Sequence, residues 1–325
     1  MPLAEVRDLT VQFVTREATV HAVNGVSFSV LPGEVLCILG ESGSGKSVTL
    51  RALMRLLPRR TRIEGSVSVD GQDVLAMPSR ALRDLRGGLV AMVFQEPMTA
   101  LDPVYTVGQQ IGETVRRHTG CDRRAARARA LELLELVRVP SAERRLDAYP
   151  HELSGGLRQR AMIAMALSCE PRLLLADEPT TALDATVQVQ VLILLRRLQR
   201  ELGMGMIFVT HDLGVASEIA DRVAVMYAGR IVESGPVAQV LSAPAHPYTR
   251  GLLASTVHGQ LRGRNIDAIP GSPPDMRRLP QGCSFAPRCA RRMPDCRLAV
   301  PEPRFPAPGR MAACLAVTEP VAVAN

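Results

Sequence analysis

Residues 35–47 of this 325-residue chain read Val-Leu-Cys-Ile-Leu-Gly-Glu-Ser-Gly-Ser-Gly-Lys-Ser. Residues 40–47 fit the pattern Gly-x-x-x-x-Gly-Lys-Ser/Thr, in which a glycine-rich loop wraps around the phosphates of a nucleotide. The apolar residues 35–39 predict a strand buried on both faces of a parallel sheet, and residues 48–54 have helical spacing. A phosphate-binding loop requires this order of strand, glycine loop and helix. The sequence therefore predicts a protein that binds a nucleoside triphosphate.

Lys46 is the only lysine of the chain, because arginine accounts for the other 38 of its 39 basic residues. A lysine ammonium is a compact point charge, whereas an arginine guanidinium is a wide planar fork that a loop closed around phosphates cannot hold. We expect Lys46 to neutralise the β- and γ-phosphates and the Ser47 hydroxyl to ligate Mg²⁺. Backbone N–H groups and the helix N-terminus complete the cradle. The predicted nucleotide-contacting residues here are Gly40, Glu41, Ser42, Gly43, Ser44, Gly45, Lys46, Ser47 and Thr49.

An acidic pair follows another apolar segment. Residues 173–176 predict a strand, and Asp177 and Glu178 come directly after it. A carboxylate at a strand end can hold Mg²⁺, commonly through water, and its neighbour can accept a proton from an attacking water. An acidic pair alone fits a solvated turn equally well, but a complete phosphate loop in the same chain favours catalysis. We therefore predict Asp177 as a Mg²⁺ ligand and Glu178 as the general base.

The length of 325 residues indicates one large and one smaller domain, and the composition indicates a globular protein. Hydrophobic residues make up 46% of the chain, as is ordinary for such proteins. No apolar run approaches the roughly 18 residues that a membrane helix needs, and no signal-peptide pattern opens the chain. The net charge of +7 comes from a basic excess that is spread widely, without an aromatic-interleaved stripe, so we predict no nucleic-acid partner. We expect a chain that is soluble by itself.

The remaining patterns predict an α/β chain followed by an irregular segment. Residues 98–166 are predicted to be mainly helical, and dense proline and glycine after residue 245 indicate a domain boundary there. The other expected elements are strands at residues 6–13, 20–30, 89–94, 206–209, 222–227 and 230–233 and helices at residues 123–137 and 186–202.

Residues 153–160 read Leu-Ser-Gly-Gly-Leu-Arg-Gln-Arg and place a serine and two glycines at a predicted helix start, where anions bind. Taken alone, an ordinary N-cap with two turn glycines fits as well. Shortly before the strand at 173–176, however, the segment resembles the signature motif of ATP-binding cassette (ABC) ATPases. That motif usually ends in glutamine; here Leu157 takes its place and Gln159 follows two residues later. Since Ser154, Gly155 and Gly156 are intact, we expect the phosphate contact to survive.

The resemblance to ABC ATPases covers roughly residues 3–245 and also includes Gln95, Ala182-Leu183-Asp184 and His211. It implies a RecA-like P-loop core with an antiparallel β subdomain and a helical signature subdomain at about residues 98–166. By the same resemblance, Gln95 would contact Mg²⁺ or the attacking water and signal to a membrane partner, and His211 would hold the γ-phosphate.

Two further roles concern the bound nucleotide. The resemblance implies that Ser154 and Gly156 reach the nucleotide of an opposing subunit, and Gly155 between them is predicted to belong to the same anion-binding segment. Phe13 is our candidate for stacking on the adenine, although a single aromatic residue in a strand also fits a core position.

The segment after residue 245 resembles the C-terminal extension of ATPases from oligopeptide/dipeptide ABC importers. The resemblance rests on His246-Pro247-Tyr248-Thr249, on residues 251–253 and 269–274, and on the stretch from Gly282-Cys283 to about residue 315. Residues 96–103, just after Gln95, also resemble that subfamily and would face the cytoplasmic coupling helix of a permease. The predicted domains are therefore an ABC nucleotide-binding domain at 1–245 and a small irregular extension at 246–325.

Four cysteines of this extension are a candidate metal site. Cys283, Cys289, Cys296 and Cys314 are separated by 5, 6 and 17 residues. Four thiolates suit a tetrahedral zinc ion or an iron–sulfur cluster, but the spacing lacks the tight Cys-x₂-Cys of a zinc ribbon. Related extensions can carry a [4Fe–4S] cluster. The alternatives left open are that cluster, zinc and plain reduced thiols.

Together these features predict the ATP-hydrolysing subunit of an ABC importer. ATP and Mg²⁺ binding would close two such subunits head to tail, and Glu178-assisted hydrolysis would reopen them. Expected partners are a second ATPase subunit of the same or a different chain, two transmembrane permease subunits and an extracytoplasmic solute-binding protein. We expect a peripheral position at the cytoplasmic face of the membrane. Oligopeptides or dipeptides are the expected solute, and nickel or another small solute is the alternative.

Other classes of ATPase fit the sequence less well. Non-transport ABC ATPases of DNA repair or translation tend to carry two cassettes or a long coiled-coil insertion between phosphate loop and signature. Here only 107 residues separate Lys46 from Ser154, without sustained heptads. A P-loop kinase or GTPase would leave Ser154-Gly155-Gly156 and His211 without a role.

Overall fold

The computed structural model describes residues 1–181, 183–255 and 268–318 and divides the chain into two compact units. The first unit comprises Met1–Ala4, Ser29–Val35 and Ser68–Val209. The second comprises Glu5–Phe28, Leu36–Val67 and the chain from Thr210 onward. The predicted boundary near residue 245 falls inside the second unit, so the division into domains at 1–245 and 246–325 stays a prediction.

The second unit contains two groups of neighbouring strands. One group has the order β2-β1-β4, from β2 (Thr19–Val30), β1 (Ala4–Val14) and β4 (Thr61–Val69). The other has the order β11-β12-β10-β9-β3, from β11 (Arg304–Ala307), β12 (Arg310–Ala312), β10 (Arg230–Pro236), β9 (Arg222–Tyr227) and β3 (Val35–Leu39). Its helices are α1 (Lys46–Leu53), α9 (Leu213–Ile219), α10 (Val237–Ser242), α11 (Pro247–Ala254), η2 (Ala286–Arg288) and η3 (Pro294–Arg297).

Strand β3 confirms the predicted buried strand that enters the glycine loop. All five of its residues are buried, and it pairs in parallel with β9, with Leu39 opposite Val225. Strands β9 and β10 are antiparallel and are connected at Ala228 and Gly229. The glycine loop therefore leaves the carboxyl end of β3, which is where ligands bind to open α/β sheets.

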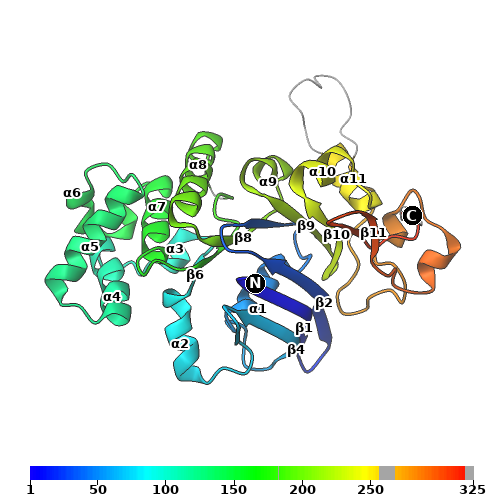
Figure 1. Ribbon diagram of the computed structural model, residues 1–325, viewed down its shortest axis with the longest axis horizontal. Coiled ribbons are helices and arrows are strands. Elements are labelled where there is room, and N and C mark those ends of the chain that lie inside the picture. The colour runs from blue at the N-terminus through cyan, green and yellow to red at the C-terminus, as the bar shows by residue number, and fades with distance from the viewer. Residues whose placement is uncertain (182, 256–267, 319–325) are drawn as a thin grey trace. The chain divides into compact units, whose positions relative to one another are not determined.

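The first unit combines three parallel strands with a group of helices. Its strands β6 (Val90–Val93), β7 (Leu173–Asp177) and β8 (Gly205–Thr210) are fully buried and pair in the order β6-β7-β8. Figure 1 shows helices α4 to α7 gathered beside one another, as predicted for residues 98–166. The remaining elements of the unit are β5 (Gln72–Asp73), α2 (Ser79–Gly88), α3 (Pro97–Ala100), α4 (Val107–Thr119), α5 (Arg123–Leu136), α6 (Ala142–Leu146), η1 (Pro150–Glu152), α7 (Gly155–Ala166) and α8 (Ala185–Leu202).

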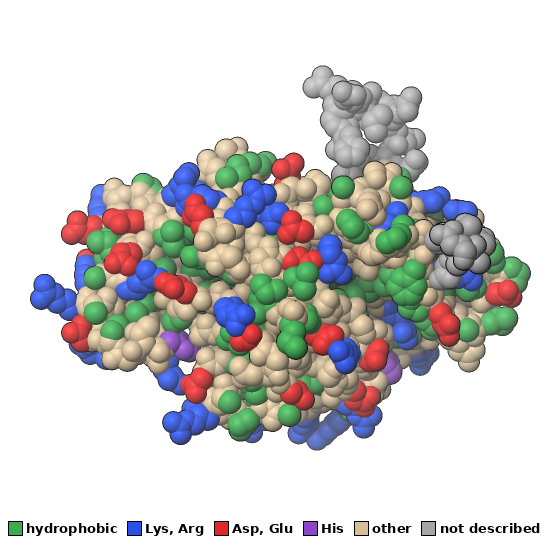
Figure 2. Space-filling model, in the orientation of Figure 1, with side chains coloured by type: hydrophobic (Ala, Val, Ile, Leu, Met, Phe, Trp, Pro, Cys, Tyr) green, Lys and Arg blue, Asp and Glu red, His purple; other side chains and the backbone are tan. Residues whose placement is uncertain are grey.

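The surface carries charges of both signs. Figure 2 shows arginine side chains interspersed with aspartate and glutamate over the visible face, as expected for a basic excess that is spread along the chain. No helix of the described residues combines the length and the apolar character needed to cross a membrane.

The C-terminal extension contributes regular structure that the sequence did not predict. Strand β12 pairs antiparallel with β10 and with β11, so a two-stranded hairpin extends the sheet of the second unit. Ala312 of β12 forms a small hydrophobic cluster with Cys314 and Val317. The extension is thus irregular only in part.

A buried carboxylate on β10 fastens the extension to the sheet. Glu233 is fully buried and accepts hydrogen bonds from the backbone N–H groups of Ala245 and His246 at 2.8 and 2.9 Å. The Nη2 atom of Arg310 on β12 donates to the same carboxylate at 2.9 Å and to the carbonyl of Ala243. Burial lowers the pKa of the adjacent His246 to about 4, and its Nδ1 accepts the N–H of Tyr248 at 3.0 Å, which caps α11.

We predict that the Glu233→Ala substitution destabilises the protein far more than removal of a surface ion pair. Loss of the carboxylate leaves the Arg310 guanidinium buried without compensation, which costs about 3–5 kcal/mol of unfolding free energy. The matched control is Asp147→Ala, because Asp147 pairs with Arg127 at 2.7 Å where both side chains are more than half exposed. That change should cost less than about 1 kcal/mol. Urea denaturation followed by circular dichroism measures both, and equal effects would contradict the anchoring role of Glu233.

Candidate nucleotide site

The glycine loop, residues 40–45, packs so closely against its neighbours that two of its glycines leave no room for a side chain. A Cβ atom on Gly40 would lie 2.2 Å from the carbonyl oxygen of Met226, and one on Gly45 would lie 2.4 Å from that of Ala22. Gly43 and Gly45 have φ of +78° and +103°, and a left-handed backbone costs a residue with a side chain about 1–2 kcal/mol. The glycines at these positions therefore meet a steric requirement of the loop itself.

Lys46 begins α1 and holds its side chain against the loop. Its Nζ donates to the carbonyl oxygens of Gly40 and Glu41 at 2.7 and 2.9 Å, and the residue is only 4% exposed. Phosphate oxygens are stronger acceptors for a charged donor than neutral carbonyls are. The ammonium can therefore exchange these carbonyls for the β- and γ-phosphates of a nucleotide.

The loop hydroxyls differ in what they can offer to a phosphate. Ser44 is buried, and its Oγ makes no hydrogen bond within the described residues, which is costly unless a ligand satisfies it. Thr49 is also buried, but its Oγ1 donates to the carbonyl of Gly45 at 3.0 Å within its own helix. The predicted nucleotide contacts of Ser44 and Thr49 both stay predictions, and the Thr49 hydroxyl would have to leave the carbonyl of Gly45 to reach a phosphate. Ser47 is half-buried in the first turn of α1.

The predicted acidic pair lies at the carboxyl end of β7 in the first unit. Asp177 is the last residue of the strand and is 1% exposed. Glu178 has φ of +45°, donates its N–H to the carbonyl of Val209 at 3.0 Å, and accepts the Thr181 hydroxyl at 2.9 Å. A left-handed residue other than glycine stores strain of a kind that gathers at active sites. The turn thus fixes where the Glu178 carboxylate points. Within the predicted Ala182-Leu183-Asp184 segment, Ala182 lies outside the described residues, and Asp184 caps α8.

Helix α7 begins at the predicted signature. Ser154 is its N-cap and accepts the N–H of Leu157 at 3.4 Å, while Gly155 is exposed. A Cβ on Gly156 would lie 2.7 Å from Cγ1 of Val187, so a side chain there would force the Val187 side chain to shift. Gln159 is 1% exposed inside the helix, so it does not replace the glutamine that Leu157 displaces.

The remaining predicted residues follow strand ends or lie within strands. Gln95 is exposed just beyond β6 in the first unit, and His211 is exposed just beyond β8 in the second. Phe13 is half-buried in β1, a position that fits both adenine stacking and packing. The phosphate loop, Phe13 and His211 belong to the second unit, and Gln95, Asp177, Glu178 and Ser154 belong to the first. The assignment of both sets to one nucleotide is a proposal.

Comparisons with known proteins agree with this set of motifs. The family described as ABC transporter matches residues 23–181, and the one described as oligopeptide/dipeptide transporter, C-terminal region, matches residues 232–296. The chain is 53% identical over 313 residues to a protein of Brucella melitensis named as a peptide import ATP-binding protein, covering 92% of this chain and 93% of that one. It is 48% identical over 317 residues to the oligopeptide transport ATP-binding protein OppD of Salmonella typhimurium, covering 98% and 94%. The chain belongs to the ABC transporter family.

A solved member of the family has the same fold. The dimeric ATP-binding cassette in a post-hydrolysis state, bound to ADP and Pi, is 29% identical with a TM-score of 0.65, and the match covers 72% of this chain and 98% of that one. The predicted RecA-like core and the predicted ATPase activity are therefore confirmed. The roles of individual site residues stay predictions.

The four cysteines of the extension of this ABC ATPase line one small cavity. Cys283, Cys289, Cys296 and Cys314 surround a space of about 10 Å³, and all are free thiols. The N–H of Cys283 donates to the carbonyl of Cys296 at 2.8 Å, which joins two of the segments. Burial raises the pKa of Cys283 and of Cys289. Sequence spacing alone could not show that residues 31 positions apart converge here.

As their side chains stand, the described residues form no metal site. Among the residues that the structure describes, no group of three or more His, Cys, Asp or Glu side chains is arranged to hold a metal ion. The donor set suits a metal centre, but the cavity is no larger than one water molecule requires. The cysteine side chains would have to separate to admit a cluster.

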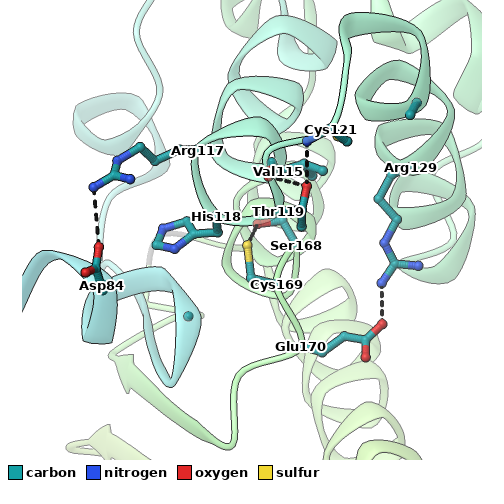
Figure 3. A pocket seen from close by; sticks show the side chains of 12 residues that line it. Asp84, Val115, Arg117, His118, Thr119, Cys121, Arg129, Ser168, Cys169 and Glu170 are labelled. Atoms are coloured by element: carbon teal, nitrogen blue, oxygen red, sulfur yellow. Dashed lines mark hydrogen bonds and ion pairs between the residues drawn. The ribbon is translucent and has the colours of Figure 1, made fainter. Parts of the chain in front are cut away.

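A larger hollow lies elsewhere in the first unit (Figure 3). It has a volume of about 730 Å³ and is bordered by the ends of α2 and α4, the start of α5 and the turn after α7. Arg117 pairs with Asp84 across one side at 3.5 Å, and Arg129 pairs with Glu170 across another at 2.7 Å. The hollow brings together none of the residues predicted for the nucleotide site, so we assign it no catalytic role.

We predict that two alanine substitutions in the phosphate loop separate steric clash from backbone strain. Gly45→Ala forces a contact with the carbonyl oxygen of Ala22, so ATP affinity should fall by more than about a hundredfold. Gly43→Ala meets open space and adds only the left-handed backbone cost, which corresponds to about tenfold. Calorimetric titration with ATP measures both. Equal losses, or a greater loss for Gly43→Ala, would contradict the packing described here.

Proposed function

We propose that this ABC ATPase drives the uptake of oligopeptides or dipeptides across the cytoplasmic membrane. The observation that carries the proposal is a complete ABC cassette continuous with an oligopeptide/dipeptide-type C-terminal region. The names of the Brucella and Salmonella relatives, which are 48–53% identical along nearly the whole chain, favour peptides over nickel or another small solute. They equally favour transport over DNA repair or translation.

For ATP hydrolysis we propose that residues of both units serve one nucleotide. Lys46 and the loop N–H groups would bind the β- and γ-phosphates, and Ser47, Gln95 and Asp177 would hold Mg²⁺. When bound, Mg²⁺ neutralises part of the phosphate charge. Glu178 would accept a proton from the water whose oxygen attacks the γ-phosphorus, while the bond to the β-phosphate oxygen breaks and ADP leaves. His211 would hold the γ-phosphate, and Phe13 would stack on the adenine.

We propose that a second ATPase subunit completes each site through α7. The exposed Ser154 and Gly155 leave the first backbone N–H groups of this helix accessible, and the positive end of a helix dipole favours an anion. Together with Gly156 they would contact the γ-phosphate bound by the partner. A solved ATP-binding cassette of 29% identity forms a dimer with ADP and Pi, which supports this arrangement.

The segment after Gln95 is our candidate docking surface for the permease. Met98, Val104 and Tyr105 are 48%, 68% and 52% exposed, so apolar side chains lie uncovered next to a residue proposed to sense the nucleotide. An apolar surface of this kind is suited to a partner helix. With two permease subunits, the protein would sit peripherally at the cytoplasmic face, and an extracytoplasmic solute-binding protein would supply the peptide.

We propose that the four extension cysteines hold a [4Fe–4S] cluster. Their convergence on one buried cavity supports a shared ligand, and four thiolates are the usual ligands of such clusters. The raised pKa values of Cys283 and Cys289 mean that a cluster would have to displace their protons. Zinc and reduced thiols are the competing outcomes.

The main test of the proposed function uses Glu178→Gln in the complex with its permease. We expect the variant to keep ATP binding, to lose about 10²–10⁴-fold in ATP turnover because the general base is removed, and to abolish uptake of radiolabelled dipeptides and oligopeptides into proteoliposomes. Lys46→Ala is the matched variant, because it should weaken ATP binding itself.

Two results would contradict these assignments. Normal turnover by Glu178→Gln would mean that another group is the base. Uptake of nickel but not of peptides by the parent complex would replace the proposed solute and leave the ATPase assignment intact.

Anaerobic purification tests the cluster. We expect a brown protein with broad visible absorption and about four iron atoms per chain, and loss of both in Cys289→Ser. The control is Cys121→Ser, which changes a cysteine of the first unit. This variant should retain both the visible absorption and the iron. A colourless sample with zinc, or with no metal, would rule out the cluster.

A further inference from the structure

The phosphate loop is tied to the C-terminal extension through one residue, Glu41. Its backbone N–H donates to the hydroxyl oxygen of Tyr248 at 2.9 Å. Its carboxylate accepts two hydrogen bonds from Arg288, at 2.8 Å from Nη1 and 3.2 Å from Nη2. Its carbonyl oxygen accepts the ammonium of Lys46. Every polar group of Glu41 is therefore engaged, and the extension supplies two of the three kinds of contact.

Arg288 is itself rigidly held. Its side chain is only 6% exposed, and Nε donates to the carbonyl of Pro270 at 3.0 Å while Nη2 also donates to that of Ile269 at 3.3 Å. The guanidinium lies over the rings of Tyr227 and Phe285, 5.8 and 6.0 Å from their centroids. Burial lowers the pKa of Arg288, but the hydrogen bonds to Glu41 and Tyr227 raise it above the ordinary value, so the group stays charged. A planar fork held in this way fixes a carboxylate in one position.

Tyr248 is held in the same aromatic cluster. It is fully buried, and its ring packs against those of Tyr227 and Phe285 at centroid distances of 4.6 and 5.4 Å. Burial raises its pKa, which keeps the hydroxyl neutral. The backbone just before it is anchored by Glu233, so the hydroxyl cannot easily follow a moving loop.

These contacts offset two unfavourable features of the loop sequence, a negative charge and a high glycine content. Glu41 places a negative charge in a loop that must bind a triphosphate, and like charges repel. The loop also contains three glycines, which allow it many conformations when it is not held. Arg288 neutralises the carboxylate, and Arg288 and Tyr248 together fix the position of Glu41 relative to β3 and β9. A loop held in its binding conformation spends less free energy on ordering when a ligand arrives.

We propose that Arg288 and Tyr248 are positioning residues for ATP binding, which hold Glu41 so that the phosphate loop is preformed for the nucleotide. The extension is then a working part of the nucleotide site. The inference rests on the proposed assignment of residues 40–47 to the phosphates, and it adds two residues that the sequence patterns do not place in the site.

The test measures ATP affinity and turnover in the full chain. Arg288→Ala should raise the dissociation constant for ATP with Mg²⁺ about tenfold or more, and Arg288→Lys should recover part of the loss because it keeps the charge. Tyr248→Phe removes one oxygen and keeps the ring, so we expect a rise of about threefold. With saturating ATP, kcat should change by less than about twofold, because the loss lies in binding.

Controls separate positioning from stability. Arg292→Ala, which changes an exposed arginine of the same segment, should bind ATP like the parent. Glu41→Gln combined with Arg288→Ala should lose no more affinity than Arg288→Ala alone, because the two residues act through one contact. Circular dichroism and melting temperature establish that each variant is folded.

The outcomes decide the proposal. Folded Arg288→Ala and Tyr248→Phe proteins that bind ATP within about twofold of the parent would overturn it, even if their melting temperatures were lower. If the Arg288→Ala variant does not fold, the ATP affinity of Tyr248→Phe decides the proposal, because that variant keeps the aromatic ring and its packing. If instead the Lys46→Ala variant binds ATP as tightly as the parent protein does, that result would contradict the phosphate-loop assignment on which the inference rests.

Discussion

The phosphate loop packs directly against the backbone carbonyl oxygens of Met226 and Ala22, and this close approach constrains the rest of the site. Since no Cβ atom fits on Gly40 or Gly45, the chain can leave β3, turn and begin α1 within residues 40–46. The turn places Lys46 at the start of the helix with its ammonium among loop carbonyls. A compact charge is needed at position 46, and lysine supplies it. Among the 39 lysine and arginine positions of the chain, position 46 is the one that is not arginine.

In the extension, arginine side chains hold carboxylates in fixed positions. Arg288 and Arg310 each meet a carboxylate in the second unit, Glu41 and Glu233 respectively, with side-chain exposures of 6% and 10%. A permanently charged fork is suited to such contacts, because breaking a buried pair leaves an uncompensated charge. One pair fastens the extension to β10 and the other fastens it to the phosphate loop. Cys289 directly follows Arg288, so a ligand of the cysteine cavity would lie next to this second contact.

Continuous apolar runs and glycine patterns made much of the fold predictable. Three apolar runs form buried strands, at residues 35–39, 173–176 and 206–209. Both faces of a parallel sheet are covered, so such strands are apolar throughout and can be recognised from a continuous apolar run. Strand β4, helix α2 and the hairpin of β11 and β12 were missed. Strands β11 and β12 are only four and three residues long, and pairing with β10, not local pattern, makes them strands.

The candidate site was predictable where the chemistry lies in contiguous motifs, as in residues 40–47 and 154–156. The contacts of Glu41 were not, because Arg288 lies 247 residues and Tyr248 lies 207 residues away in sequence. Arg288 is one of 38 arginines, and Tyr248 lies in the segment His246-Pro247-Tyr248-Thr249; neither position carries a local sign of its contact with Glu41. Nor could the sequence show the environment of Gln159, which is buried inside α7 at 1% exposure.

The most direct measurement is a crystal structure of the protein with bound ATP and Mg²⁺. We expect Nζ of Lys46 to leave the carbonyls of Gly40 and Glu41 for the β- and γ-phosphates, while Glu41 keeps its bonds to Tyr248 and Arg288. A triphosphate bound away from residues 40–47, or a nucleotide-bound loop in which Glu41 has left Arg288 and Tyr248, would contradict it.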